Sequence, residues 1–162
     1  MDIEIEEKKK WSIIRNKLNQ NYYYDDNWEE AINLFEYRLM NKFFNPIQQI
    51  INNRILKGEG FAILTVQCSL IEMFAAFRNG KIFNHRYKAT TSPKYEYKFS
   101  EEMFTSLLKT NEIFKNIFWQ KNENGIIEKD KPYSSSEFYK NVRCGLMHEA
   151  KTKGNWYIMQ HL

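Results

Sequence analysis

The chain has 162 residues and a mass of 19.7 kDa, the size of one ordinary domain, which excludes a multidomain machine. Hydrophobic residues make up 43% and charged residues 27%, with only 6 glycines and 3 prolines, so a disordered, collagen-like or proline-rich chain is also excluded. The formal net charge of +4 is too small to indicate, by itself, a dedicated nucleic-acid-binding protein. We therefore predict a single folded domain over residues 1–162.

Two sequence features favour a cytoplasmic protein. Cys68 and Cys144 are too few for a disulfide framework or a four-cysteine zinc site. The acidic first residues lack the basic start and the apolar run of a secretory signal. The apolar run 61–77 is too short and too polar for an easy membrane span, which needs about 20 apolar residues. We expect no membrane contact, no metal and no cofactor.

The first half of the chain predicts one long helix. Residues 1–22 form an N-terminal segment to which we assign no regular structure. Over residues 26–56 the apolar side chains recur every three or four positions, which predicts an amphipathic helix. Asp26 and Glu29 have the spacing of a capping box that would begin this helix. Pro46 should kink the helix, or split it just before the proline.

The middle of the chain predicts two helices joined by a long basic loop. The run 61–77 is mostly apolar and indicates a central helix buried on nearly all sides. Residues 80–99 lack a helical period and form a long connection or a pair of short strands. The segment from residue 81 to residue 99 contains five basic residues and one acidic residue. An apolar stripe over residues 100–119 predicts another amphipathic helix.

The last third predicts a final helix and an extended end. Ser134 and Glu137 have capping-box spacing and would open a helix that runs to about Ala150. Residues 156–158 suit an extended segment that closes over the core. The predicted fold class is therefore all-α: an antiparallel bundle of four to five helices with a long connecting loop and a short C-terminal extended segment.

The last helix has two distinct faces at 100° per residue. Its core face holds Phe138, Tyr139, Val142, Gly145, Leu146, Glu149 and Ala150. Arg143 and His148 stand about 140° apart and bracket the other arc, which also holds Lys140, Cys144 and Met147. Because a solvated arc seldom carries Cys and Met, we infer contact with a second copy across a two-fold axis. Such a homodimer would gather two Arg143–His148 pairs in one cleft.

The motif Arg143-Cys-Gly-Leu-Met-His148 resembles the Arg-x4-His motif of the HEPN superfamily. The wider string FYKNVRCGLMHEAKTKGNWYI, with an upstream apolar helix bearing one glutamate, is similar to HEPN proteins of bacterial defence and toxin–antitoxin systems. The resemblance covers roughly residues 26–150. It implies a HEPN-like helical bundle that dimerises and cleaves RNA without metal, leaving a 2′,3′-cyclic phosphate and a 5′-hydroxyl.

The chemistry of the two motif residues suits this reaction. An imidazole with an unperturbed pKa near 6.5 can move protons at neutral pH, so His148 is the candidate acid–base. A guanidinium is always charged and grips phosphoryl oxygens, so Arg143 is the candidate for transition-state stabilisation. The alternative is an exposed arginine and a histidine favoured by the helix dipole.

Three further residues are candidate supporting groups. Glu72 is the only charge in the run 61–77; we predict a pair with Arg143 or His148, with another cation or water as the alternatives. Asn141 could hydrogen-bond substrate, or could be a surface residue. Cys144 could be a nucleophile or half a metal site beside His148, although no further cluster completes a site; a structural thiol is the other interpretation.

Substrate binding is assigned to basic side chains. Arg86 and Lys88 in the 80–99 loop, and Lys140 on the last helix, are candidate phosphate contacts. The loop also carries aromatic residues that could stack on bases. The alternative is a solvated loop whose aromatic side chains pack on the bundle.

The function predicted is a metal-independent endoribonuclease of a bacterial toxin–antitoxin or phage-defence (abortive infection) system, with RNA as substrate and an antitoxin or defence protein as a possible partner. Two departures keep alternatives open. Cys144 stands where many family members have a polar residue, which favours a non-catalytic HEPN-like module that binds RNA, a nucleotide or a protein. Ala150 replaces the tyrosine of the antitoxin-modified subtype, so we expect no nucleotide transfer there. A purely structural helical dimer is the third reading.

Overall fold

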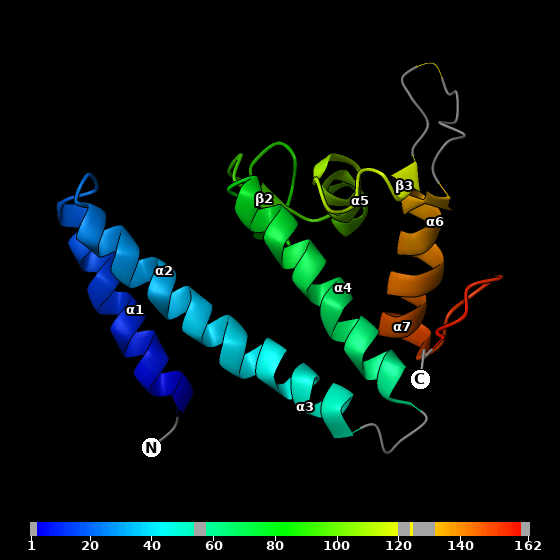
Figure 1. Cartoon of the computed structure of the whole chain (residues 1–162). Helices are drawn as coiled ribbons and strands as arrows, with labels where there is room; N and C mark the ends of the chain where they lie inside the picture. Colours follow the sequence, from blue (N-terminus) through cyan, green and yellow to red (C-terminus); the bar gives the residue numbers. More distant parts are fainter. Residues whose placement is uncertain (1–2, 54–57, 120–123, 125–131, 160–162) are drawn as a thin grey trace. The chain divides into compact units, whose positions relative to one another are not determined.

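The computed structural model describes residues 3–53, 58–119, 124 and 132–159. The chain is mostly helical, which confirms the all-α class, and its few strands are two residues long (Figure 1). Its internal contacts form two compact units, Met1–Ile55 and Leu56–Leu162, where the sequence led us to expect one domain. Each unit is described by itself.

The first unit begins with a helical hairpin. Helix α1 spans Ile3–Gln20, so the N-terminal segment has a helix that the sequence analysis did not assign. Helix α2 spans Asp25–Leu39. Ile14 and Leu18 of α1 are buried against Ala31 of α2 and form a small apolar cluster. Burial of this narrow stripe stabilises the packing of the two helices.

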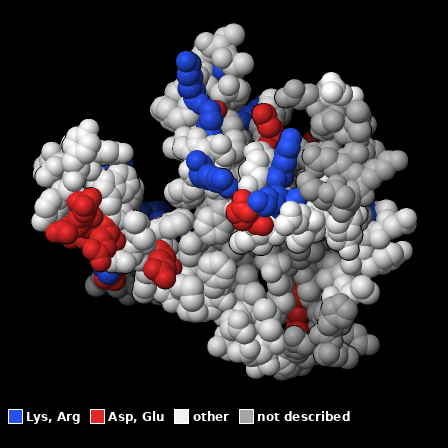
Figure 2. Space-filling model, turned by 45° about the horizontal axis from the view of Figure 1, so that its top comes forward, with Lys and Arg blue, Asp and Glu red and all other residues white. Residues whose placement is uncertain are grey.

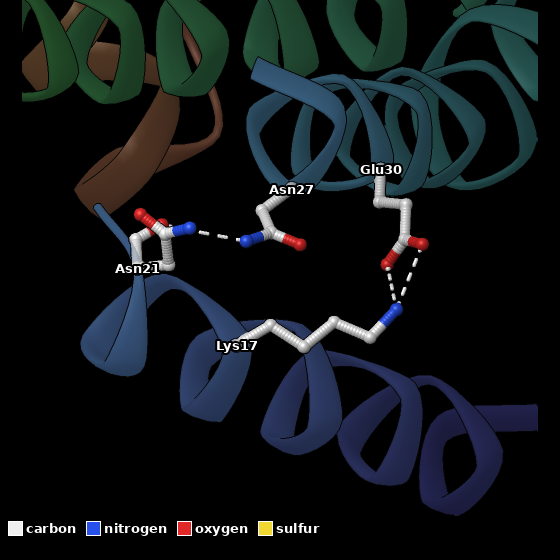
Figure 3. Close-up of polar contacts among 4 residues, drawn as sticks. All are labelled: Lys17, Asn21, Asn27 and Glu30. Carbon is white, nitrogen blue, oxygen red and sulfur yellow. Dashed lines mark hydrogen bonds and ion pairs between the residues drawn. The ribbon is translucent and has the colours of Figure 1, made fainter. Parts of the chain in front are cut away.

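Polar contacts join the two helices beside their turn. Lys17 Nζ lies 2.8 and 2.7 Å from the two carboxylate oxygens of Glu30. The Asn27 side-chain amide donates to the Asn21 carbonyl at 3.4 Å (Figure 3). Asn27 is buried, so this bond meets a hydrogen-bonding need that water cannot meet there.

The predicted capping box at the start of α2 is wrong. The N-cap position is Tyr24, whose side chain makes no capping hydrogen bond, and the helix already includes Asp25 and Asp26. The two aspartates lie in the first turn, where negative charge interacts favourably with the helix dipole. This interaction stabilises the N-terminus without the reciprocal capping bonds that we expected.

A buried carboxylate links α1 to the end of α2. Glu7 has only 5% of its side chain exposed, and its Oε2 lies 3.3 Å from Arg38 Nε and 2.6 Å from Lys42 Nζ. Removing this charge would leave two cations without their shared partner. Because both cations are partly solvated, the loss is smaller than for a fully buried pair.

We expect Glu7→Gln to lower the free energy of unfolding of the full chain by about 1–2 kcal/mol. Urea unfolding followed by tryptophan fluorescence measures the change. The matched control is Glu6→Gln, because the pair that Glu6 makes with Lys10 is exposed. Equal stability of the two variants would contradict the role given to Glu7.

The helix continues through Pro46, so of the two predicted alternatives, a kink or a split before this proline, the split is not found. A π turn, η1, spans Met40–Phe44, and helix α3 spans Asn45–Asn53. The Asn45 N–H donates to the Met40 carbonyl, five residues back. Proline cannot donate the next bond, and the wider turn just before it accommodates the ring without ending the helix.

The second unit contains the helices that carry the motif. Helix α4 spans Glu59–Arg78 and packs against α5, Ser100–Thr110 (Figure 1). A final helix consists of α6 (Ser135–Phe138), the π turn η2 (Tyr139–Arg143) and α7 (Cys144–Glu149). The buried core between these helices consists of Cys68, Phe104, Leu108, Phe118 and Tyr139.

Helix α4 is less buried than predicted. Its buried positions are Cys68, Leu70, Ala75 and Ala76, whereas Phe61 and Phe77 are exposed. The helix has 20 residues, so the expectation that this run is too short for a membrane span is also wrong: by length and composition it could cross one. The helix packs against α5, where Cys68 lies in one buried cluster with Phe104 and Leu108.

The loop after α4 contains a pair of short strands, which is one of the two structures predicted for this segment. Strand β1, Ile82–Phe83, pairs in parallel with β2, Glu96–Tyr97, with Ile82 opposite Glu96. The pairing returns the chain to the end of α4 before α5 begins. It therefore brings residues of β2 beside α4.

Helix α5 ends at Thr110, so the predicted helix to residue 119 is wrong. Asn111 has extended backbone angles, and its side-chain oxygen accepts from the Ile113 N–H at 2.9 Å. This local bond replaces a helical one, as asparagine commonly does in turns. Strand β3, Phe118–Trp119, follows and pairs in parallel with β4, Tyr133–Ser134.

The predicted cap of the final helix is confirmed. Ser134 Oγ accepts from the Glu137 N–H at 3.2 Å. The helix ends at Glu149 rather than Ala150, because Ala150 adopts the left-handed conformation with φ of 54°. Beyond it, Trp156 packs on Phe138 with ring centroids 5.4 Å apart, so the C-terminal segment closes over the core without forming a strand.

Candidate functional site

The centre of the candidate site is an ion pair between two distant segments. Arg143 Nη2 lies 2.6 Å from Glu72 Oε2, and their side chains are 16% and 14% exposed. Glu72 comes from the middle of α4 and Arg143 from the end of η2. The predicted pairing of Glu72 with Arg143 is confirmed. A lone carboxylate on an apolar helix needed a cation, and the motif arginine provides it.

Two tyrosines that sequence reasoning missed extend this pair. Burial, together with the charge of the nearby Glu72 carboxylate, raises the pKa of Tyr97. Arg143 Cζ lies 5.4 Å from the centroid of the Tyr139 ring. Burial raises the pKa of Tyr139 to about 12. Both phenols are thus neutral groups beside a charged pair.

The charge on Arg143 is secure in this environment. Burial acts against the charged guanidinium, but the hydrogen bond and the charge of Glu72 outweigh it and raise the pKa of Arg143. The carboxylate also limits the directions that the guanidinium can take. The site therefore holds a permanently charged and oriented group, half-buried between α4, β2 and the final helix.

A π turn shapes the backbone at the motif. The Cys144 N–H donates to the Tyr139 carbonyl, five residues back, within the η2 segment. Such turns are frequent at functional sites. The predicted core face is confirmed for the residues from Phe138 to Leu146 that were assigned to it, which are buried or half-buried. It is wrong for Glu149 and Ala150, which are exposed because the helix ends there.

Cys144 lies on the core side rather than on the arc opposite the core. It packs against the buried cluster that includes Cys68 and Tyr139. The wheel at 100° per residue misplaces it because the π turn changes the angular increment just before it. This packing favours a structural thiol over the nucleophile or metal-ligand readings.

We expect Cys68 to resist alkylation in the native chain. It is fully buried, and burial raises the pKa of its thiol to about 12, so almost no reactive thiolate forms near pH 8. Mass spectrometry after brief iodoacetamide treatment should find Cys68 unmodified, with full modification of the same chain in denaturant. Rapid native labelling of Cys68 would contradict the described core.

His148 lies in the last turn of α7 and is exposed. No hydrogen bond or ion pair described in the structure joins it to Arg143. The structure thus brings together Arg143 and Glu72, while His148 lies apart from this pair on the exposed side of the helix, beside Met147, which is also exposed. Within one chain, the two motif residues do not form a closed site.

The C-terminal segment folds back on the motif helix. A Cβ added to Gly145 would lie 2.4 Å from the Lys151 carbonyl oxygen. The Lys153 N–H donates to the Asn141 carbonyl at 2.8 Å, and the Asn141 amide lies near Gly154. Asn141 is half-buried and faces this segment. No contact described in the structure joins Asn141 to Arg143. The glycine inside the helical pattern was the signal for this close approach.

The predicted substrate-binding cations lie on the surface without forming one cluster. Arg86 and Lys88 are exposed in the loop between β1 and β2, and Arg86 Nε contacts His85 Nε2 at 3.1 Å. Lys140 Nζ lies 3.7 Å from a Glu101 oxygen and is also exposed. Figure 2 shows several separate basic side chains on one face of the molecule, with acidic ones among them.

No group of three or more metal-ligating side chains occurs among the residues that the structure describes. No family model matches the chain, and neither a curated protein nor a solved structure matches it. The class that fold and site define is a mostly helical protein with a half-buried arginine–glutamate pair beside a π turn.

Proposed function

We propose that the chain is a metal-independent endoribonuclease of HEPN type, with a composite site formed by Arg143 and His148 of two copies. The observation that carries the proposal is the 2.6 Å pair of Arg143 with Glu72. It provides a charged, oriented guanidinium on the helix that also presents His148. The proposal includes a bacterial toxin–antitoxin or phage-defence role in the cytoplasm, with an antitoxin or defence protein as partner.

The reaction needs two proton transfers and one stabilised charge. One His148 would remove the proton of a ribose 2′-hydroxyl, whose oxygen then attacks the adjacent phosphorus. The P–O bond to the 5′-oxygen breaks, and the second copy's imidazolium would protonate that leaving oxygen. Arg143 would stabilise the negative charge that grows on the phosphoryl oxygens. The products are a 2′,3′-cyclic phosphate and a 5′-hydroxyl.

Glu72 would act as a positioning residue for Arg143. A guanidinium has five N–H donors in a fixed plane, so it can keep a carboxylate and bind a phosphoryl oxygen at the same time. The Tyr139 ring lies beside the guanidinium, and Tyr97 lies near the Glu72 carboxylate. The arrangement lowers the reorganisation needed in the transition state.

In a second candidate function, a non-catalytic module that binds RNA, a nucleotide or a protein, the ion pair is a structural contact and not the binding site. Glu72 cancels the net charge of Arg143, which weakens the attraction of the pair for a phosphate. In that case Arg143 would hold α4 to the final helix, and His148 would be an exposed surface residue.

The test is cleavage of labelled RNA by the purified chain in excess chelator. We expect His148→Ala to lower the cleavage rate by about 10²–10⁴-fold, because general acid–base catalysis has that magnitude. Light scattering should show the same oligomeric state for parent and variant. The matched control is Gln49→Ala, since Gln49 is also an exposed polar residue but lies on α3 of the first unit. A parent chain that leaves RNA intact, or needs metal, or cleaves equally well without His148, would reject the enzyme.

A further inference from the structure

The two cysteines of the chain, Cys68 and Cys144, are far apart in the sequence but meet in the core of the second unit. Cys68 lies on α4, and Cys144 is the first residue of α7. Helices α4 and α7 are in contact, and Cys144 packs against the buried cluster to which Cys68 belongs. The proposed reaction uses neither thiol, so this pairing needs an explanation of its own.

The two thiols also interact electrostatically, both with each other and with Arg143. Burial has the largest effect on the pKa of Cys68; the charge of Arg143 lowers this pKa and the Cys144 thiol raises it. Arg143 interacts with Cys144 too, because Cys144 acts with Glu72 against the effect of burial on the Arg143 pKa. A cation beside a thiol favours the thiolate, which is the form that reacts.

The two thiols differ in their access to solvent. Cys68 is completely buried beside Phe104 and Leu108, whereas Cys144 is half-buried. A small oxidant in solution therefore reaches Cys144 and not Cys68. Once Cys144 is oxidised, the thiol that lies beside it is Cys68, which needs no entry into the core.

We infer that Cys68 and Cys144 are a redox pair, in which a hydroperoxide oxidises Cys144 and Cys68 then forms a reversible disulfide with it. This inference goes beyond the proposed function and does not rest on it. Disulfides in a reducing compartment are usually transient and sense the redox state. The bond would join α4, which bears Glu72, directly to the residue that follows Arg143.

The reaction has two balanced steps. In the first, the Cys144 sulfur attacks one peroxide oxygen, the O–O bond breaks, and the other oxygen leaves as water or an alcohol with the thiol proton. Cys144 is then a sulfenic acid. In the second step, the Cys68 sulfur attacks the Cys144 sulfur, the S–O bond breaks, and the hydroxyl leaves as water with the Cys68 proton. The thiols lose two electrons in all, and the peroxide gains them.

The slow alkylation expected of Cys68 agrees with this order of events. Iodoacetamide has to enter the core to reach Cys68, but the oxidised Cys144 is already there. The high pKa of Cys68 slows the second step, and the fixed position of the two sulfur-bearing residues opposes this effect, since a reaction within one chain has a high effective concentration.

The test uses the dilute full-length chain, first reduced and then freed of reductant. The chain is exposed to hydrogen peroxide, its remaining thiols are capped with N-ethylmaleimide in denaturant, and the intact mass is measured without reductant. We expect a monomer that has lost two hydrogens and takes up no N-ethylmaleimide, and a digest should contain Cys68 and Cys144 in one linked peptide pair. Dithiothreitol should restore uptake at both thiols. The oxidised monomer should unfold at a higher temperature than the reduced one, because the bond closes a long loop.

Two variants separate the roles of the thiols. Cys68→Ala keeps a small apolar side chain in the core, and its Cys144 should stop at the sulfenic acid, which dimedone labels. Cys144→Ser should stay reduced in the same peroxide, because Cys68 is closed to solvent. Circular dichroism shows whether both variants fold, and the assay of the parent chain decides the question without them.

The inference is overturned if the parent keeps both thiols free in excess peroxide, or forms disulfides only between chains. It is also overturned if Cys144 proceeds to the sulfinic or sulfonic acid while Cys68 stays free, or if Cys68 is oxidised equally fast in Cys144→Ser. These failures are distinct from failure of the proposed function, because RNA cleavage is measured with reductant present and uses neither thiol.

Discussion

Phe104→Ala is expected to lower the free energy of unfolding by about 3–5 kcal/mol. The Phe104 side chain is completely buried in the core of the second unit. Its ring stacks on Phe138 at 6.2 Å and meets Tyr139 at 5.4 Å. Truncation removes the transfer free energy of the ring and leaves a cavity between α5 and the final helix, which rigid helices cannot fully close.

Urea unfolding followed by tryptophan fluorescence measures this loss, and Phe99→Ala is the control. Phe99 is an exposed ring immediately before α5, so its removal should change stability by less than about 0.5 kcal/mol. A similar loss in both variants would mean that Phe104 is not a core residue. Because Tyr139 contacts both Phe104 and Arg143, the core variant should also weaken any activity that depends on the arginine.

The parts of the structure that the sequence predicted well each follow from one simple physical requirement. The cap at Ser134 follows from the reach of a serine oxygen to the N–H three residues on. The pair of Glu72 with Arg143 follows from the cost of burying one carboxylate among apolar neighbours. The strand pair was one of two forms allowed by a segment without helical period.

The first error concerns the residues at which helices begin and end, which depend on local chemistry. The stripe after Thr110 continues in sequence, but the Asn111 side chain forms a turn bond that competes with the helix. The opposite case is α1, whose buried stripe is narrow and lies within a charged sequence. Its exposed pairs, such as Lys8 with Glu4, add helical support that a search for apolar periodicity does not detect.

The second error concerns the geometry of the site. A wheel at 100° per residue assumes one hydrogen-bond pattern, and the π turn at Tyr139–Arg143 departs from it, which places Cys144 toward the core. Tyr97 reaches Glu72 only because β2 pairs with β1, a tertiary event without a local signal. Sequence patterns could therefore name the charged pair but not the tyrosines around it.

Gly145→Ala is the second variant with a large expected effect, because the motif helix and the returning chain touch at this residue. The added Cβ would lie 2.4 Å from the Lys151 carbonyl oxygen, a backbone atom that cannot rotate away. The Lys151 N–H also donates to the Gly145 carbonyl at 3.3 Å, so the two segments are bonded where they would have to separate. We expect a loss of about 1–3 kcal/mol in the free energy of unfolding.

The control for Gly145→Ala is Gly58→Ala, since a Cβ at Gly58 would meet no atom within 4 Å. Thermal and urea unfolding should distinguish the two variants, with the Gly58 variant within about 1 kcal/mol of the parent because Gly58 is the N-cap of α4. Gly145 lies between Arg143 and His148, so any shift that relieves the clash also moves these two residues relative to each other. Cleavage should then fall further in the Gly145 variant than its remaining folded fraction explains. Full stability with full cleavage would show that the C-terminal segment does not pack on the motif helix, and that Arg143 and His148 are positioned without it.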